Sequence, residues 1–270
     1  VYEAKNEQTG EVTKDFRCKT PIAVVPYPAK PVEPADIDLE LDYDFNFLTV
    51  AQWGPRKNLE NTIRWFLESF KDKEVGLVLK TNLAKNCIID RRVCTHKLKE
   101  ITGEYPDRKC KVYMLHGYMT AAEMSALYNN PKIKSYITAT HGEGYGLPIF
   151  EAAYYGMPII APGWSGHVDF LYHEVKDKKG KSRVKPMFSK VDFRIKPIKK
   201  EAVWKGVLPE ESMWCFVDEK SFKSRMLDVH SNYSIYKKRA KDLKKLVEKK
   251  YEENAINDMF ARAVFGGELT

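Results

Sequence analysis

The fold of this chain is decided by the stretch SYITATHGEGYGLPIFEAAYYGMPIIA, residues 135–161. Residues 135–140 and 158–161 are two apolar runs of strand length. Between them, Pro148 suits the first position of a helix and Gly156 suits the position just past its end. The stretch therefore predicts a strand, a glycine-containing turn, a helix and a second strand, which together make one βαβ unit.

The same alternation of strand and helix extends toward the N-terminus. The remaining strands are expected at residues 45–50, 75–79 and 112–115. The helices are expected at residues 59–70, with Asn58 as N-cap, at 89–101, at 120–128, opened by a capping box of Thr120 and Glu123, and at 148–155. Apolar strands that alternate with helices predict an α/β fold, a Rossmann-like parallel sheet with helices on both faces.

The flanks of this region differ in composition. Residues 1–44 are rich in proline and then acidic, which is typical of an extended linker, whereas residues 45–270 form the expected Rossmann-like domain. A basic insertion is expected at about 174–200 and a long C-terminal helix at about 231–262. The apolar stripe of that helix consists of Tyr236, Ala240, Leu243, Val247 and Tyr251.

Composition excludes several classes of protein. The chain has 270 residues, of which 43% are hydrophobic and 30% charged, so it is neither disordered nor collagen-like. Its longest uncharged stretch, residues 152–168, contains three glycines and two prolines, and a membrane-spanning helix is not expected there. The chain begins with Val1 and no secretory signal follows, so we expect a processed or truncated product.

The five cysteines are scattered and include no C-x-x-C pair, which favours a reducing, cytoplasmic location. A disulfide between Cys87 and Cys94, or a zinc site that adds His96, is the less favoured alternative because a second pair of ligands is missing.

The positive charge is concentrated in one segment. The chain has a formal charge of +8, and residues 176–200 carry nine lysines, two arginines and two aspartates, which leaves −1 for the rest. One such local basic loop, without a pattern of interleaved stacking aromatics, predicts a solvated segment rather than a specific nucleic-acid site. Contact with an acidic acceptor or an anionic membrane is the alternative.

Two loops carry the residues expected to do chemistry, since ligands of open parallel sheets bind beyond the carboxyl ends of the strands. One loop, residues 52–58, contains Arg56 and Lys57, and the other, residues 141–148, is rich in glycine and opens a helix. The N-terminus of a helix attracts anions by only about 0.3 to 1 kcal/mol when exposed. A diphosphate would therefore also need the two cationic side chains.

Two carboxylates accompany the second loop. Glu143 lies within the loop, and Glu151 lies about one turn into the helix that the loop opens. Carboxylates do not suit phosphate but are strong acceptors for the hydroxyl groups of a sugar or ribose. A ligand that combines diphosphate and sugar would satisfy all of these groups. Taken singly, each group also has an ordinary explanation, as a turn glycine, a charge at a helix start or a solvated basic pair.

Taken together, residues 140–161 closely resemble the signature of the retaining GT-B glycosyltransferases, the family with two glutamates separated by seven residues that includes bacterial mannosyltransferases and sucrose synthase-like enzymes. The resemblance extends over roughly residues 45–172, through residues 55–58, 117–128 and 166–169. It implies that this chain is the C-terminal, donor-binding half of a GT-B fold.

The resemblance also implies roles for individual residues. Lys57, helped by Arg56, would hold the donor diphosphate, Glu143 would face the transferred sugar, and Glu151 would accept hydroxyls of the ribose. The remaining donor-binding residues that it implies are Thr140, Gly144, Tyr145, Gly146 and Leu147 around sugar and phosphate, and Gly117, Tyr118 and Met119 around the base.

The sequence departs from the family in three places. Gln52 stands where many relatives have a glycine-arginine pair, Asp169 stands where a glutamate is common, and Thr140 replaces a usual serine. The residues before Phe45 are also too few for the acceptor-binding N-terminal domain of such enzymes. The acceptor is therefore expected to bind to a missing domain.

The function implied by the resemblance is transfer of a hexose from a nucleoside-diphosphate sugar with retention of configuration and without a metal or other cofactor. A metal-dependent class is the first alternative, because residues 36–38 and 42–44 both spell aspartate-x-aspartate, although they lie in the acidic linker. A non-catalytic nucleotide-sugar-binding module and a nucleotide-sugar epimerase are the others.

Overall fold

The computed structural model describes residues 2–5, 9, 12–16, 22–176 and 180–266. The chain divides into two compact units, one formed by Val1–Pro28 with Tyr251–Thr270 and the other by Ala29–Lys250. The smaller unit contains an antiparallel hairpin of β1 (Tyr2–Lys5) and β2 (Val12–Phe16) in the segment expected to be a linker. The larger unit contains the central sheet and the whole candidate site.

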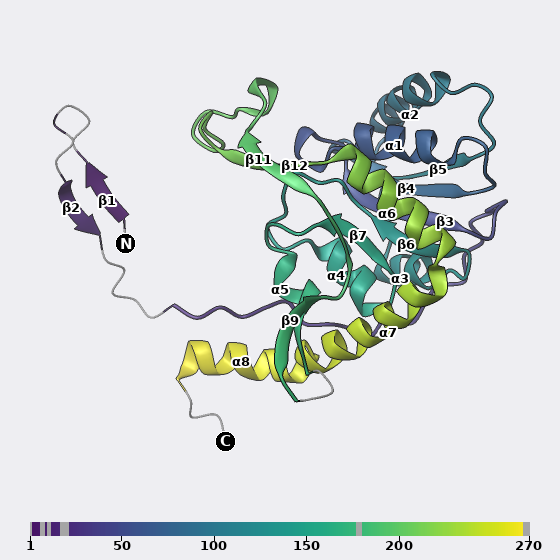
Figure 1. The fold of residues 1–270 in the computed structure, drawn as a ribbon. Coiled ribbons are helices and arrows are strands. Elements are labelled where there is room, and N and C mark those ends of the chain that lie inside the picture. The colour runs from purple at the N-terminus through teal and green to yellow at the C-terminus, as the bar shows by residue number, and fades with distance from the viewer. Residues whose placement is uncertain (1, 6–8, 10–11, 17–21, 177–179, 267–270) are drawn as a thin grey trace. The chain divides into compact units, whose positions relative to one another are not determined.

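The central sheet has six parallel strands in the order β10-β7-β6-β3-β4-β5 (Figure 1). They are β3 (Asn46–Gln52), β4 (Gly76–Asn82), β5 (Lys111–His116), β6 (Ile133–Ile137), β7 (Ile159–Pro162) and β10 (Ser189–Val191). The predicted α/β fold with a Rossmann-like parallel sheet is confirmed.

Helices cover both faces of this sheet. One face carries α1 (Leu59–Phe70), α2 (Ile88–Gly103) and α6 (Glu219–Ser231), which contact one another in pairs, and the other carries α3 (Ala121–Asn129) and α4 (Leu147–Tyr154) (Figure 1). Successive strands are added toward one side of the sheet from β3 to β5 and toward the other side from β6 onward. Right-handed crossovers that step in opposite directions along a sheet cover opposite faces, so the two sets of helices lie on opposite faces.

The core follows from the apolar stripe of α1. Leu59, Ile63, Phe66, Leu67 and Phe70 are all buried, as their helical spacing predicts. The ring of Phe47 from β3 lies 6.1 Å from that of Phe66 and 5.3 Å from that of Phe70. Burying each such side chain contributes about 1.5 to 3 kcal/mol, so this contact fixes the face of α1 that meets the sheet.

The C-terminal region contains two helices where one is expected. These are α7 (Tyr233–Lys250), whose Ala240, Leu243 and Val247 are buried, and α8 (Glu253–Phe265). The side chain of Glu252 accepts hydrogen bonds from the backbone of Asn254 and Ala255, so it caps the start of a new helix. The apolar stripe of residues 236–251 therefore ends where the second helix begins.

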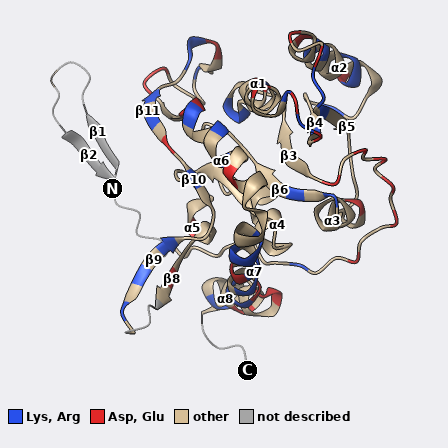
Figure 2. Ribbon diagram, turned by 45° about the vertical axis from the view of Figure 1, so that its right-hand side comes forward, with Lys and Arg blue, Asp and Glu red and all other residues tan. Residues whose placement is uncertain are grey.

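The basic segment is only partly a solvated insertion. It contains a hairpin of β8 (Tyr172–Lys176) and the exposed β9 (Ser182–Pro186), and then β10, which is the edge strand of the central sheet. Next comes a ribbon of β11 (Phe193–Pro197) and β12 (Met213–Val217). Figure 2 shows lysine and arginine along β9 and β11. Residues 177–179 lie outside the described part of the chain.

The carboxyl ends of the parallel strands form a single edge of the sheet, and the loops that follow them carry the candidate site. The loop after β3 contains the short helix η1 (Pro55–Lys57), and the loop after β7 leads to α5 (Val168–Leu171). Among the described residues, no helix is both long and apolar enough to cross a membrane.

Candidate functional site

The turn after β3 presents two cations at the sheet edge. Helix η1 ends with Arg56 and Lys57, and Asn58 follows in the left-handed conformation with φ 52°. Asn58 occupies the expected N-cap position of α1, but its side chain makes no cap hydrogen bond. Its Nδ2 atom instead donates to the carbonyl of Ala139 at 3.0 Å, which ties the cationic turn to the loop after β6.

The glycine loop, residues 140–146, follows β6 and opens α4. Gly146 has φ 90°, a left-handed conformation that favours glycine, and α4 begins at the next residue with proline in its first turn. The backbone N–H of His141 donates to the carbonyl of Arg56 at 2.8 Å. The two loops therefore form one structure at the sheet edge, as expected from their positions after neighbouring strands.

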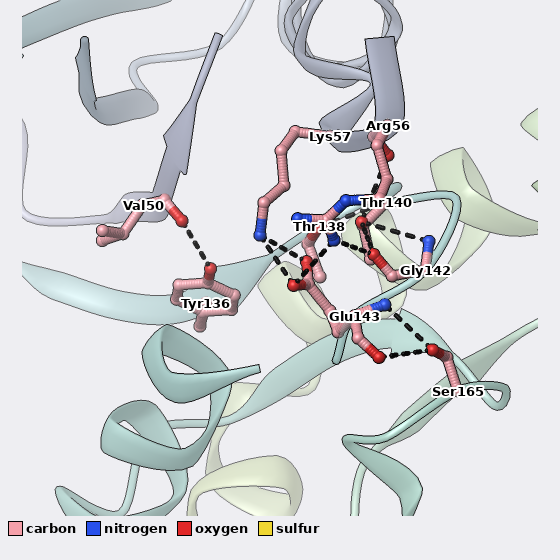
Figure 3. A network of polar contacts seen from close by, with 9 residues as sticks. All are labelled: Val50, Arg56, Lys57, Tyr136, Thr138, Thr140, Gly142, Glu143 and Ser165. Atoms are coloured by element: carbon pink, nitrogen blue, oxygen red, sulfur yellow. Dashed lines mark hydrogen bonds and ion pairs between the residues drawn. The ribbon is translucent and has the colours of Figure 1, made fainter. Parts of the chain in front are cut away.

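The central contact of the site is between Lys57 and Glu143 (Figure 3). The Nζ atom of Lys57 lies 2.7 Å from each carboxylate oxygen of Glu143. Arg56 Nη1 lies 3.2 Å from Glu143 Oε2 and also donates to the carbonyl of Gly142. The Glu143 side chain is 8% exposed, the Lys57 side chain 16% and the Arg56 side chain 44%, so the group is accessible from the Arg56 side.

The charges of this group control its protonation. Burial alone would raise the pKa of Glu143, but the charge of Lys57 and its hydrogen bond hold that pKa below the ordinary value of 4.5. Glu143 is therefore ionised at neutral pH. Two cations and one carboxylate leave an uncompensated positive charge at the mouth of the glycine loop, beside the N-terminus of α4.

The second glutamate, Glu151, lies on α4 beside Tyr128. Burial raises the pKa of Glu151, and a hydrogen bond from Tyr128 offsets part of that shift. The ring of Tyr128 stacks on that of Tyr155, with centroids 5.5 Å apart. The two glutamates thus have opposite environments, since that of Glu143 lowers its pKa and that of Glu151 raises its pKa.

The remaining predicted residues of the glycine loop differ in what they expose. Thr140 is fully buried, and its hydroxyl donates to the backbone carbonyls of Arg56 and Gly142, so it supports the loop from within. The ring of Tyr145 packs against Phe150 and Phe170. Gly144 has open space where a side chain would stand, and Leu147 is 43% exposed.

The other predicted loop, Gly117 to Met119, follows β5 at the same edge, three strands along the sheet from the glycine loop after β6. Lys80 from β4 donates to the carbonyl of Gly117, and Gly117 has φ 95°. Tyr118 is 74% exposed and Met119 is partly exposed. This loop is therefore open to a ligand that extends along the edge from the glycine loop.

The loop after β4 is held by a buried carboxylate that the sequence analysis did not single out. Asp90 accepts hydrogen bonds from the backbone of Leu83, Ala84 and Lys85 at 2.6 to 2.8 Å, and from His116 Nε2 at 2.7 Å. Burial would raise the pKa of Asp90, but these hydrogen bonds lower it strongly. Asp90 thus clamps the loop that neighbours Gly117.

The cysteines give no support to the disulfide or to the zinc site with His96. Cys87, Cys94, Cys110 and Cys215 are free, and Cys18 lies outside the described residues. Ligand atoms of Asp90, Cys94 and His116 lie within 4.8 Å of one another, which could accommodate a metal ion. The oxygens of Asp90 are already taken by three backbone N–H groups and His116, so the cluster is explained as a clamp.

The second aspartate-x-aspartate pair, Asp42 and Asp44, lies away from the glycine loop. Asp42 pairs with Lys111 at 2.9 Å and accepts a hydrogen bond from Tyr113. Lys111 is the first residue of β5, so Asp42 lies at the amino end of the strands. The candidate site lies at their carboxyl ends.

Two contacts that hold the glycine loop in place are not predicted by the sequence. The hydroxyl of Ser165, from the loop after β7, bonds to the backbone N–H and C=O of Glu143. The imidazole Nδ1 of the buried His141 lies 2.6 Å from the carbonyl of Cys215, which ties the loop to the β11–β12 ribbon. The glycines around Ser165 are a signal of a turn after a strand, but these partners are too distant in sequence to be inferred.

Comparison with solved structures finds glycosyl-transferring or synthesising proteins with a similar fold. HepE of Anabaena, solved with UDP and glucose, has a TM-score of 0.56 and 13% identity, over 84% of this chain and 49% of that one. Sucrose-phosphate synthase of Thermosynechococcus elongatus has a TM-score of 0.56 and 14% identity, over 89% and 51%. A glycosyltransferase of Rickettsia africae has a TM-score of 0.55 and 10% identity, over 83% and 48%.

The chain therefore has the Rossmann-like fold of one half of a GT-B glycosyltransferase and spans about half the length of these structures. No protein-family model and no curated protein matches the sequence. At such low identity the likeness concerns the fold alone.

Proposed function

We propose that this chain is the donor-binding half of a retaining, metal-independent glycosyltransferase that moves a hexose from a nucleoside-diphosphate sugar to an acceptor. The observation that carries the proposal is the convergence of Lys57 and Arg56 with Glu143 at the mouth of the glycine loop. Cations, helix amides and a carboxylate are the groups that a diphosphate and a sugar together require.

The diphosphate binds between the cationic turn and the start of α4. Lys57 and Arg56 neutralise its charge, and the backbone N–H groups of residues 145–147 point toward it from a helix N-terminus. As the bond to the sugar breaks, negative charge grows on the departing phosphate, and these fixed positive groups stabilise it. A second domain would hold the acceptor.

The two carboxylates bind the hydroxyl groups of the sugar and the ribose. Glu143 releases part of its contact with Lys57 and accepts a hydrogen bond from the transferred sugar. Glu151, whose pKa is raised by burial, accepts a ribose hydroxyl. Gly144 contributes by leaving the space for this approach, because a side chain there would fill the open side of the loop. Tyr118 and Met119 flank the base.

Calorimetric titration tests the proposal. We expect the chain to bind at least one of UDP, GDP and ADP in excess chelator, since the cations of the site are side chains. Lys57→Ala should weaken that binding by about 2 kcal/mol, the size of a charge-assisted hydrogen bond, or roughly 30-fold. Lys238→Ala removes the same charge from an exposed position on α7 and is the matched control.

The outcomes separate this proposal from its alternatives. Absence of binding to every nucleoside diphosphate would refute it, as would equal binding by the Lys57→Ala variant. Binding that requires a divalent metal would favour the metal-dependent class. Binding of a nucleoside diphosphate by this chain, without sugar transfer by a protein that carries both halves of the fold, would favour a non-catalytic module. A changed sugar in the recovered nucleotide would indicate an epimerase.

A further inference from the structure

The loop after β7 braces the glycine loop along most of its length. We call residues 164–167 the brace. A side chain at Gly142 would lie 3.0 Å from the ring of Trp164, and one at Gly146 would lie 3.1 Å from Cβ of His167. A side chain at Gly166 would overlap the backbone of Gly144. The two loops therefore pack backbone to backbone, and only the side of Gly144 away from the brace is open.

Ser165 makes the polar part of this contact (Figure 3). Its Oγ accepts from the backbone N–H of Glu143 at 2.9 Å and donates to the carbonyl of Glu143 at 2.6 Å. The N–H of Gly166 donates to the same carbonyl at 3.1 Å. Both backbone polar groups of Glu143 are thus held by the brace, while its side chain is held by Lys57 and Arg56.

The backbone of Ser165 is strained. Its φ of 84° lies in the left-handed region, where a residue with a Cβ costs roughly 1 to 2 kcal/mol. Such strain persists only where surrounding contacts impose it. Glycine would relieve the strain, but it would remove the hydroxyl that holds Glu143.

We infer that Ser165 is a positioning residue, whose hydroxyl fixes the backbone of Glu143 and thereby the place of its carboxylate and of the loop amides. The effect on nucleotide binding rests on the proposed function, whereas the effect on the loop does not. An ordered glycine loop binds a diphosphate without first losing conformational freedom, so loss of the hydroxyl should weaken binding.

Two variants separate positioning from folding. Ser165→Ala removes the hydroxyl and keeps the backbone strain, and Ser165→Gly removes the hydroxyl and relieves the strain. We expect the glycine variant to melt at the same temperature as the original chain or higher, and both variants to bind the preferred nucleoside diphosphate about tenfold more weakly. Ser182→Ala, on the exposed β9, is the control.

Amide hydrogen exchange gives a measurement that does not need the nucleotide. The Glu143 amide should exchange at least tenfold faster in both variants than in the original chain, because it loses its acceptor. Unchanged exchange at Glu143, or full nucleotide affinity in Ser165→Gly, would overturn the inference. If the original chain binds no nucleoside diphosphate, the proposed function fails and the exchange rates still decide the role of Ser165.

Discussion

Lys57 and Glu143 are 86 positions apart in the sequence, and the Nζ atom of one lies 2.7 Å from both carboxylate oxygens of the other. The pair joins the turn after β3 to the loop after β6, two neighbouring strands of the sheet. In this structure the Glu143 carboxylate is paired with the two cationic side chains that a diphosphate would need. Under the proposed function, a diphosphate would therefore compete with Glu143 for Lys57 and Arg56.

Replacing the competing carboxylate should strengthen binding of an anion. Glu143→Gln removes one negative charge a few ångströms from the phosphate position, which we expect to tighten binding of inorganic pyrophosphate by about tenfold at low salt. Isothermal titration measures this. Glu60→Gln makes the same change on α1, where the carboxylate meets the partly exposed Lys97, and should leave the affinity unchanged. Weaker binding by Glu143→Gln would contradict the competition.

The two glutamates should give opposite pH dependences of stability. The folded-state pKa of Glu143 is lowered from 4.5, so its contribution is present above pH 4.5 and is lost as the pH falls through the lowered pKa. The pKa of Glu151 is raised from 4.5 by burial, so ionisation of Glu151 destabilises the fold as the pH rises above 4.5 through the raised pKa.

Thermal unfolding of the two glutamine variants between pH 3 and 8 measures these contributions. Relative to the original chain, Glu151→Gln should gain stability as the pH rises above 4.5, whereas Glu143→Gln should be less stable by a constant amount above pH 4.5 and should approach the original chain only as the pH falls below 4.5. If both variants shifted the melting temperature in the same direction at neutral pH, the assigned environments would be wrong.

Much of the fold could be predicted because its signals are local. The apolar stripe of α1 and the capping box of Thr120 and Glu123 depend on neighbours within one or two turns, and both are present in the structure. The meeting of Lys57 with Glu143 follows from the rule that parallel strands end at one edge. The direct ion pair between these two side chains does not follow from that rule, because it depends on the side-chain conformations.

The features that were not predicted depend on contacts between distant residues. Strand β10 has three residues, with Ser189 and Val191 buried and Lys190 exposed, and so short an alternation is indistinguishable from a solvated basic segment. The left-handed backbone of Ser165 is imposed by the glycine loop. The C-terminal stripe continues through Tyr251, so its pattern does not show that α7 ends at Lys250.

Two glycines of the loop, Gly144 and Gly146, should respond differently to alanine. Gly146→Ala places a side chain at φ 90° and 3.1 Å from His167, which we expect to cost roughly 1 to 2 kcal/mol or more of folding free energy. Gly144→Ala meets nothing within 4 Å and should leave the melting temperature within about a degree. It should nevertheless weaken nucleotide binding, since its new methyl group lies on the open side of the loop. Equal melting temperatures for the two variants would contradict the assigned backbone.

Thiol labelling should distinguish the cysteines by burial. Among the four described cysteines, only Cys87 is exposed, and burial raises the pKa of Cys94 and Cys110 to about 11 and that of Cys215 to about 12. Thiolates are the reactive form, so a maleimide at pH 7 should label Cys87 rapidly and the other three only after denaturation. Peptide mass spectrometry of the native and denatured protein measures this, with Cys87→Ser as control. Fast native labelling of Cys94 would show that the Asp90 clamp opens, because Cys94 Sγ lies 3.5 Å from Asp90 Oδ1 inside that cluster.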